Sequence, residues 1–177
     1  FSLYAKLPKP QLQPMDASRL RELIESLADF YLARTRVDYC WVGWPLEFTL
    51  SVDHGQIRQV LSNLIKNGNE AMDGQGTLAF ELAIVPEPGQ RMESEHQGSW
   101  VRLVVKDSGP GLTGDPDRIF EPYITTKTTG TGLGLAVARR IVEDNGGCLW
   151  AGTSPEGASF VIDLPDTASQ PKGNHCA

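Results

Sequence analysis

The spacing of apolar residues along the chain predicts three amphipathic helices. One is expected to follow a cap at Asp16, a second to follow a cap at Asp53, and a third to cover residues 133–144 before Asn145-Gly-Gly147 stops it. In each helix the apolar residues recur every three or four positions, so one face is available for burial. These positions are Leu20, Leu23, Ile24, Leu27 and Tyr31 in the first helix, Ile57, Leu61, Leu64, Gly68 and Met72 in the second, and Val137, Ala138, Ile141 and Val142 in the third.

Alternation of apolar and polar residues predicts the strands. The expected strands cover residues 46–52, 78–85, 101–105, 148–151 and 159–164. A loop rich in proline, glycine and charge joins the second strand to the third, which predicts a hairpin with a long tip. Strands with one apolar face and three amphipathic helices together predict a two-layer α/β sandwich, with one sheet covered on one side.

The length of 177 residues and the hydrophobic content of 40% are enough for one domain with a sizeable core. We expect that domain to cover residues 15–166. Residues 1–14 contain three prolines and suit an extended linker, and residues 167–177 are expected to form a frayed tail. Because the chain begins with Phe1 and not with methionine, we expect it to be a fragment of a longer protein.

Charge, hydropathy and cysteine content exclude several classes of function. The net charge of −6 argues against a nucleic-acid surface, which would need clustered basic residues. No window approaches the roughly 18 apolar residues of a membrane span, so we expect no membrane contact by this fragment. The three cysteines lack the spacing of a metal site or a disulfide framework, which favours a reducing, cytoplasmic setting.

Two asparagines lie four positions apart on the second predicted helix. Asn63 and Asn67 therefore share one face, away from the stripe that contains Leu61 and Leu64. Amide oxygens are hard ligands that suit a Mg²⁺ ion otherwise bound by waters and phosphate oxygens. The same spacing is common on ordinary solvated helix faces, and the asparagines taken alone favour that interpretation; the motifs that follow favour the magnesium site.

Asp107 follows the apolar run of the third predicted strand, which places its carboxylate at a strand end. A carboxylate there can accept the exocyclic amine of adenine, and Gly109 and Gly111 would let the backbone approach the ring. An ordinary turn built for conformational reasons is an equally good interpretation of Asp107-Ser-Gly-Pro-Gly111.

A second glycine cluster, Gly130-Thr-Gly-Leu-Gly134, precedes the third helix and indicates a phosphate site at the helix N-terminus. No strand pattern comes before it and no Walker A lysine follows it, which excludes the two familiar phosphate-binding motifs. Between the clusters, Lys127 is a candidate for the terminal phosphate on a mobile lid, although a solvated surface lysine is the common alternative.

In this order and spacing, the motifs resemble the ATP-binding catalytic domain of sensor histidine kinases. Asn63–Asn67 resembles the N box of that family, Asp107–Gly111 the first G box, Phe120–Lys127 the F box and Gly130–Gly134 the second G box. The resemblance spans Asp16–Pro165, and the residue sequence of the F box is most similar to that of the nitrogen-regulation sensor kinases.

The resemblance implies a Bergerat fold, which is a mixed, mostly antiparallel sheet covered on one face by three helices. It implies that Mg-ATP is the ligand, that Asn67 binds Mg²⁺, and that Asn67 and Lys127 are catalytic. The implied nucleotide-binding residues are Asn63, Asn67, Asp107, Gly109, Gly111, Lys127, Thr131, Gly132, Leu133 and Gly134.

The implied partners are a phosphoacceptor helical domain that precedes the linker in a homodimeric kinase, and a response regulator. No acceptor histidine is visible here, because His54, His96 and His175 all lack the acidic residue and downstream proline of an H box. Sensor histidine kinases resemble a wider group that also contains gyrase, heat-shock-90 and mismatch-repair ATPases. In the ATPase branches of this group, a glutamate stands where this chain has Asn63. An amide there cannot act as a general base, so we expect slow intrinsic hydrolysis.

The sequence departs from the family pattern at three places. Gly68 stands where alanine is usual, at a cost of roughly 1 kcal/mol in helix propensity. Glu70 replaces a basic phosphate contact, and Ala158 replaces the threonine of the third glycine box. Ser159 could supply the missing hydroxyl, or the hydrogen bond could go to water.

Two other functions remain open at this point. The domain could sense ATP without transferring phosphate, or it could be a slow self-sufficient ATPase, against which Asn63 argues.

Overall fold

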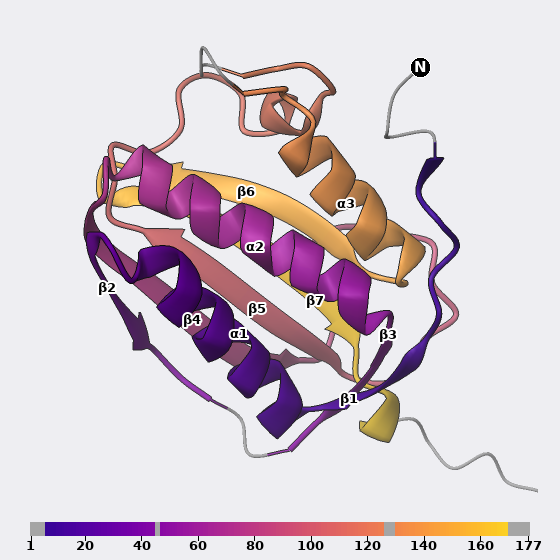
Figure 1. The fold of residues 1–177 in the computed structure, drawn as a ribbon. Coiled ribbons are helices and arrows are strands. Elements are labelled where there is room, and N and C mark those ends of the chain that lie inside the picture. Colours follow the sequence, from indigo (N-terminus) through magenta and orange to yellow (C-terminus); the bar gives the residue numbers. More distant parts are fainter. Residues whose placement is uncertain (1–5, 45–46, 126–129, 170–177) are drawn as a thin grey trace, which may run out of the picture.

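The described part of the chain forms a two-layer sandwich in which three helices cover one face of a five-stranded sheet (Figure 1). The computed structural model describes residues 6–44, 47–125 and 130–169. The helices are α1 (Ala17–Leu32), α2 (His54–Ala71) and α3 (Gly134–Asp144), with short 3-10 helices η2 (Arg118–Phe120) and η3 (Thr167–Ser169). The strands of the sheet are β2 (Arg36–Trp41), β4 (Gln75–Val85), β5 (Trp100–Asp107), β6 (Cys148–Ser154) and β7 (Gly157–Pro165).

The sheet is mixed and mostly antiparallel. Its strand order is β2-β4-β5-β7-β6, in which β2 runs parallel to β4 and the remaining neighbours are antiparallel. The predicted fold class is therefore confirmed. The predicted hairpin is the β4–β5 pair, whose register places Leu78 opposite Asp107 and Val85 opposite Trp100.

The predicted helix caps are also confirmed. Asp16 accepts a hydrogen bond from the backbone N–H of Arg19 at 2.8 Å, and Asp53 accepts one from that of Gln56 at 3.0 Å. At the end of α3, Gly146 has a φ of +86° and the N–H of Gly147 donates to Val142 O at 2.9 Å, which is the left-handed stop expected there.

The strand predictions were less complete. The strand expected at residues 46–52 is β3 (Thr49–Val52), and it pairs with β1 (Gln13–Asp16) in a separate two-stranded sheet. Strand β2 was not predicted, although Val37, Tyr39 and Trp41 alternate with polar neighbours. It forms an edge of the sheet and is held by aromatic contacts with Phe80 at ring distances of 6.1 and 5.4 Å.

The segment before α1 runs along the domain. Residues 6–12, called the N-terminal arm below, lead into β1. Within this arm the carbonyl of Pro8 accepts a hydrogen bond from the side chain of Gln56 at 2.9 Å, and the N–H of Gln11 donates to Asp53 Oδ2 at 2.8 Å. Part of the predicted linker therefore packs against the start of α2.

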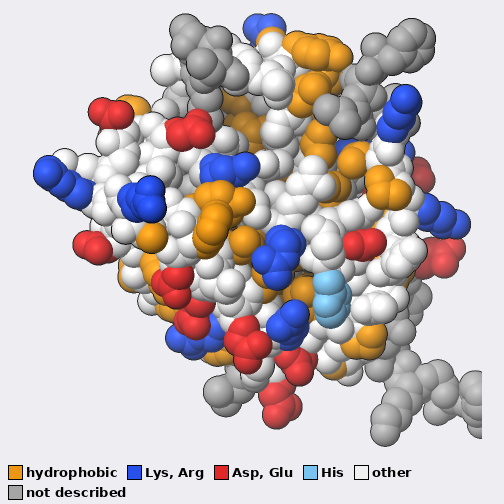
Figure 2. All heavy atoms as spheres, in the orientation of Figure 1, with side chains coloured by type: hydrophobic (Ala, Val, Ile, Leu, Met, Phe, Trp, Pro, Cys, Tyr) orange, Lys and Arg blue, Asp and Glu red, His pale blue; other side chains and the backbone are white. Residues whose placement is uncertain are grey.

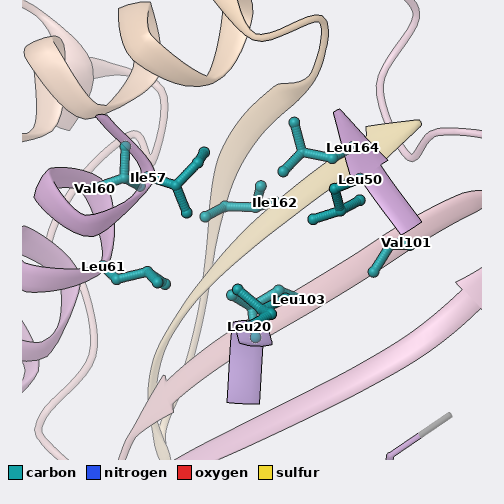
Figure 3. A pocket seen from close by; sticks show the side chains of 9 residues that line it. All are labelled: Leu20, Leu50, Ile57, Val60, Leu61, Val101, Leu103, Ile162 and Leu164. Carbon is teal, nitrogen blue, oxygen red and sulfur yellow. The ribbon is translucent and has the colours of Figure 1, made fainter. Parts of the chain in front are cut away.

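A small apolar cavity of about 20 Å³ lies in the core between the helices and the sheet (Figure 3). Leucine, isoleucine and valine side chains line it throughout: Leu20, Leu50, Ile57, Val60, Leu61, Val101, Leu103, Ile162 and Leu164. A void of this size without polar partners is a packing defect and not a ligand site. In the described ranges, no helix combines the length and the apolar character needed to cross a bilayer.

Candidate nucleotide-binding site

Asp107 ends β5 and is buried, with 4% of the residue exposed. Its Oδ1 accepts hydrogen bonds from the N–H groups of Gly109 at 2.9 Å and Ala158 at 3.2 Å. The other oxygen, Oδ2, has no hydrogen-bond partner among the described residues. A carboxylate oxygen without a hydrogen-bond partner among the described residues is suited to accept an amine from a ligand.

The two glycines after Asp107 allow close contacts within the protein. A Cβ on Gly109 would lie 3.0 Å from Ala71 O, at the end of α2. Gly111 has a φ of +84°, and a Cβ there would lie 2.6 Å from Thr153 Oγ1 on β6. The same hydroxyl accepts a hydrogen bond from Leu112 N at 2.7 Å. The glycines are therefore needed to fit this loop between α2 and β6, a conformational requirement that agrees with the turn interpretation and leaves the approach to a ligand open.

Asn63 joins the second helix to the second glycine cluster. Its Nδ2 donates a hydrogen bond to Gly134 O at 3.1 Å. The amide oxygen is thereby oriented away from this contact. Asn67 lies one turn further along the same face of α2 and is half-buried, next to Gly68, where an added Cβ would lie 3.7 Å from Asp107 Cβ. The structure thus brings the asparagines, Asp107 and the second glycine cluster to one end of the helix layer.

The N-terminus of α3 differs from those of α1 and α2, because no side chain caps it. The cap position, Leu133, forms no side-chain hydrogen bond to the helix, whereas aspartates cap the other two helices. The amides of the first turn consequently remain available to an anion. Gly132 has a φ of +69° and accepts a hydrogen bond from Tyr123 N at 2.9 Å, while Thr131 Oγ1 accepts one from Leu133 N at 3.4 Å.

The segment between the glycine clusters is anchored by Phe120. This ring is buried, packs edge-to-face on Phe160 at 6.3 Å, and has the Arg139 guanidinium 4.6 Å from its centre. Three residues later, Tyr123 is 63% exposed. Lys127 falls in 126–129, outside the described residues, so its assignment to the terminal phosphate stays a prediction.

The structure accounts for two of the departures from the family pattern. A Cβ on Gly68 would lie 2.7 Å from Leu78 Cδ1, so glycine gives α2 room to lie against β4. At the third glycine box, Ala158 contacts Asp107 through its backbone N–H. Ser159 does not supply the missing hydroxyl, because neighbouring residues of a strand face opposite sides and its Oγ donates to Gly152 O at 3.5 Å. Glu70 is exposed on α2.

Sequence reasoning missed two contributors to this site, Ala158 N and Thr153 Oγ1. Each reaches its partner across a long stretch of chain, 51 residues for the Ala158–Asp107 contact and 41 for the Thr153–Leu112 contact. No local spacing signals such pairs. They follow only from the antiparallel neighbours β5, β7 and β6.

The fold and the site together define a nucleotide-binding domain, with an acceptor carboxylate at a strand end and a glycine loop over uncapped helix amides. Residues 52–168 match the family model described as histidine kinase-, DNA gyrase B-, and HSP90-like ATPase. The chain belongs to this family.

Three comparisons illustrate the relationship. The chain is 31% identical to the nitrogen regulation protein NtrY of Azorhizobium caulinodans over 97% of its own length and 21% of that protein. It resembles the solved catalytic domain of the histidine kinase ThkA, with a TM-score of 0.69, 29% identity and coverage of 88% of this chain and 96% of that one. It also resembles full-length ShkA in complex with AMPPNP, with a TM-score of 0.71, 26% identity, and coverage of 95% of this chain and 34% of that one.

The chain spans only 13% to 34% of the length of its first curated relatives. It corresponds to one domain of those larger proteins.

Proposed function

We propose that this chain is the catalytic ATP-binding domain of a two-component sensor histidine kinase. The observation that carries the proposal is the hydrogen bond from Asn63 to Gly134. It puts an amide beside the glycine loop at the position where the ATPase branches of the group carry a glutamate. An amide can orient the nucleotide but cannot activate water as a general base.

In this proposal Asp107 Oδ2 accepts the exocyclic amine of adenine, and the uncapped amides of α3 bind the phosphates. The glycine cluster from Gly130 to Gly134, including Thr131, Gly132 and Leu133, forms the phosphate loop, and Lys127 contacts the terminal phosphate. The analogue AMPPNP bound to ShkA supports ATP as the nucleotide.

Magnesium is part of the proposal because its ligand chemistry fits the residues present. Within the described ranges, no three His, Cys, Asp or Glu side chains come together as a ready-made metal site. An ion held here would rely on phosphate oxygens and waters together with an amide oxygen, for which Asn67 is the candidate. Magnesium would neutralise charge on the phosphates, and the chain would supply orientation.

The phosphoryl group is proposed to pass to a histidine on a separate helical domain. The bond between the γ-phosphorus and the bridging oxygen breaks, a phosphorus–nitrogen bond forms on the imidazole, and ADP leaves. The described histidines of this chain are engaged elsewhere, since His54 Nε2 lies 2.9 Å from Pro14 O and His96 Nε2 lies 2.8 Å from Ser99 O. The acceptor would therefore belong to another part of the kinase.

The remaining proposals concern the whole kinase. A homodimer, a response regulator that receives the phosphoryl group, a cytoplasmic location and a role in nitrogen regulation would all fit the similarity to NtrY. Basic and acidic side chains are interspersed over the helix-bearing face (Figure 2), which suits a domain that does not bind nucleic acid.

Transfer to an acceptor tests the proposal. The chain is mixed with the separately made helical domain of NtrY and ATP labelled on the γ-phosphate. We expect acid-labile phosphohistidine on the helical domain, and none when its acceptor histidine is replaced by alanine. Binding of ATP without phosphohistidine would instead indicate a nucleotide-sensing module. Rapid phosphate release by the chain alone would indicate an ATPase.

A further inference from the structure

Helices α2 and α3 lie side by side and run in opposite directions across the sheet (Figure 1). Both contribute to the candidate site, α2 through Asn63 and Asn67 and α3 through its uncapped N-terminus. The hydrogen bond from Asn63 to Gly134 O links the pair at the end that holds the site. The geometry of the site therefore depends on how the two helices are held relative to each other.

A second link joins the same helices at their far end, through Asn145. Its Oδ1 accepts a hydrogen bond from Asp53 N at 2.8 Å, and its Nδ2 donates to Gln56 Oε1 at 2.9 Å and to Ile141 O at 2.8 Å. The residue is 5% exposed. The amide oxygen and both N–H groups are thus engaged between the end of α3 and the first turn of α2.

This role is separate from the glycine stop that follows α3. The stop is made by backbone groups of Gly146 and Gly147, whereas the link to α2 is made by the side chain of Asn145. Asparagine suits the position because Asp53 N needs an acceptor and Gln56 Oε1 needs a donor. Alanine would leave the buried Gln56 amide oxygen and the part-buried Asp53 N–H without these bonds, which costs stability.

The two links are well separated. Asn63 lies ten residues beyond Asp53 on α2, and Asn145 lies eleven residues beyond Gly134 on α3. At a rise of about 1.5 Å per residue, the bond between Asn63 and Gly134 and the bonds of Asn145 lie roughly 15 Å apart along the helix pair. A helix pair fixed at both ends keeps its register, whereas a pair fixed at one end can pivot.

We infer that Asn145 is a positioning residue for nucleotide binding, which holds the phosphate-binding end of α3 in register with Asn63 and Asn67 from about 15 Å away. This inference rests on the proposed function, since it requires that nucleotide binds at this site. Loss of the far link should lower the fraction of molecules in the binding-competent register, and the apparent affinity falls by that fraction.

The test compares Asn145→Ala with Asp166→Ala. Asp166 is also 5% exposed, and it accepts hydrogen bonds from Thr49 N, Ala168 N and Ser99 Oγ, so it matches Asn145 in burial and in the number of bonds lost. It links β3 to η3 and makes no hydrogen bond to α2 or α3. The melting temperature of both variants is measured by thermal unfolding. Their affinity for Mg-ATP is then measured by calorimetry at a temperature where both remain folded.

We expect both variants to melt at a lower temperature than the wild type. Only Asn145→Ala should bind Mg-ATP more weakly, by roughly tenfold, because only this variant loses the helix register. Unchanged affinity in Asn145→Ala would overturn the inference. Equal weakening in both variants would also overturn it, because the effect would then follow from stability alone.

A second variant applies if Asn145→Ala does not fold. Gln56→Met removes one partner of Asn145 while Asp53 N keeps its acceptor. We expect a weakening of a few-fold, and unchanged affinity would overturn the inference. Failure of the wild type to bind Mg-ATP would instead overturn the proposed function, and the inference with it.

Discussion

At the scale of single residues, the Asp53 carboxylate stabilises two segments of the chain. One carboxylate oxygen caps α2 through Gln56 N, and the other accepts a hydrogen bond from Gln11 N in the N-terminal arm. These bonds, with the one from Gln11 first, lower the pKa of Asp53 below its ordinary value of 3.8. A lowered folded-state pKa stabilises the fold above the unfolded value, and this stabilisation is lost as the pH falls through the folded-state pKa.

Replacing Asp53 tests that linkage. We expect Asp53→Asn to lower the free energy of unfolding at pH 7 by about 1 kcal/mol, because asparagine can still cap α2 but has no second oxygen to accept the hydrogen bond from Gln11 N. The difference from the wild type should shrink below about pH 4, because acid removes the same charge from Asp53. Urea unfolding at several pH values measures it, and a difference that does not vary with pH would contradict the assignment.

Gly68 is a second informative residue, since alanine is usual there in the family. Alanine would improve helix propensity by roughly 1 kcal/mol. Its Cβ would lie 2.7 Å from Leu78 Cδ1, and Leu78 is fully buried, so overpacking should cost about 1 to 3 kcal/mol. We expect Gly68→Ala to destabilise the domain slightly in thermal unfolding. Gly74→Ala is unsuitable as a control because its φ is +72°, whereas Gly55→Ala is suitable. A more stable Gly68→Ala variant would show that Leu78 can move aside.

At the scale of elements, the helices were predictable from sequence because caps and apolar spacing are local. Asp16 and Asp53 each mark a helix start within one residue of the structure. The pairing of β1 with β3 has no local signal, since it joins Met15 to Leu50. The prolines before β1 correctly argued against a helix, but composition does not tell whether an extended segment packs against the domain.

Removal of the N-terminal arm tests how much that segment contributes. A chain that begins at Gln13 loses the bonds from Gln11 N to Asp53 and from Gln56 Nε2 to Pro8 O. We expect unfolding to become easier by about 1 to 3 kcal/mol, because the buried Gln56 amide loses an acceptor. Gln11→Ala is the matched control, since it keeps the backbone donor and should unfold like the full chain. Equal stability of the truncated and full chains would show that the arm is not bound.

At the scale of the whole molecule, the candidate site combines what sequence could and could not predict. The order of the motifs identified Asn63, Asp107 and the second glycine cluster, because each carries its own chemistry. Their approach to one another depends on the sheet order and on the α2–α3 pair, which spacing along the chain does not encode. The links from Ala158 to Asp107 and from Asn145 to Gln56 are of this kind, and both bring together distant residues through buried hydrogen bonds.

Calorimetric titration with Mg-ATP, carried out on the wild-type chain and on Asp107→Asn, tests most directly whether the domain binds ATP through the Asp107 carboxylate. An asparagine can still accept hydrogen bonds from Gly109 and Ala158 at Oδ1, so the variant should fold. Its Nδ2 group, which takes the place of Oδ2, is a hydrogen-bond donor and cannot accept a hydrogen bond from the adenine amine. We expect micromolar to millimolar binding by the wild type and a loss of affinity of roughly 10- to 100-fold in the variant. Absence of binding by the wild type, or equal affinity of the two proteins, would contradict this expectation.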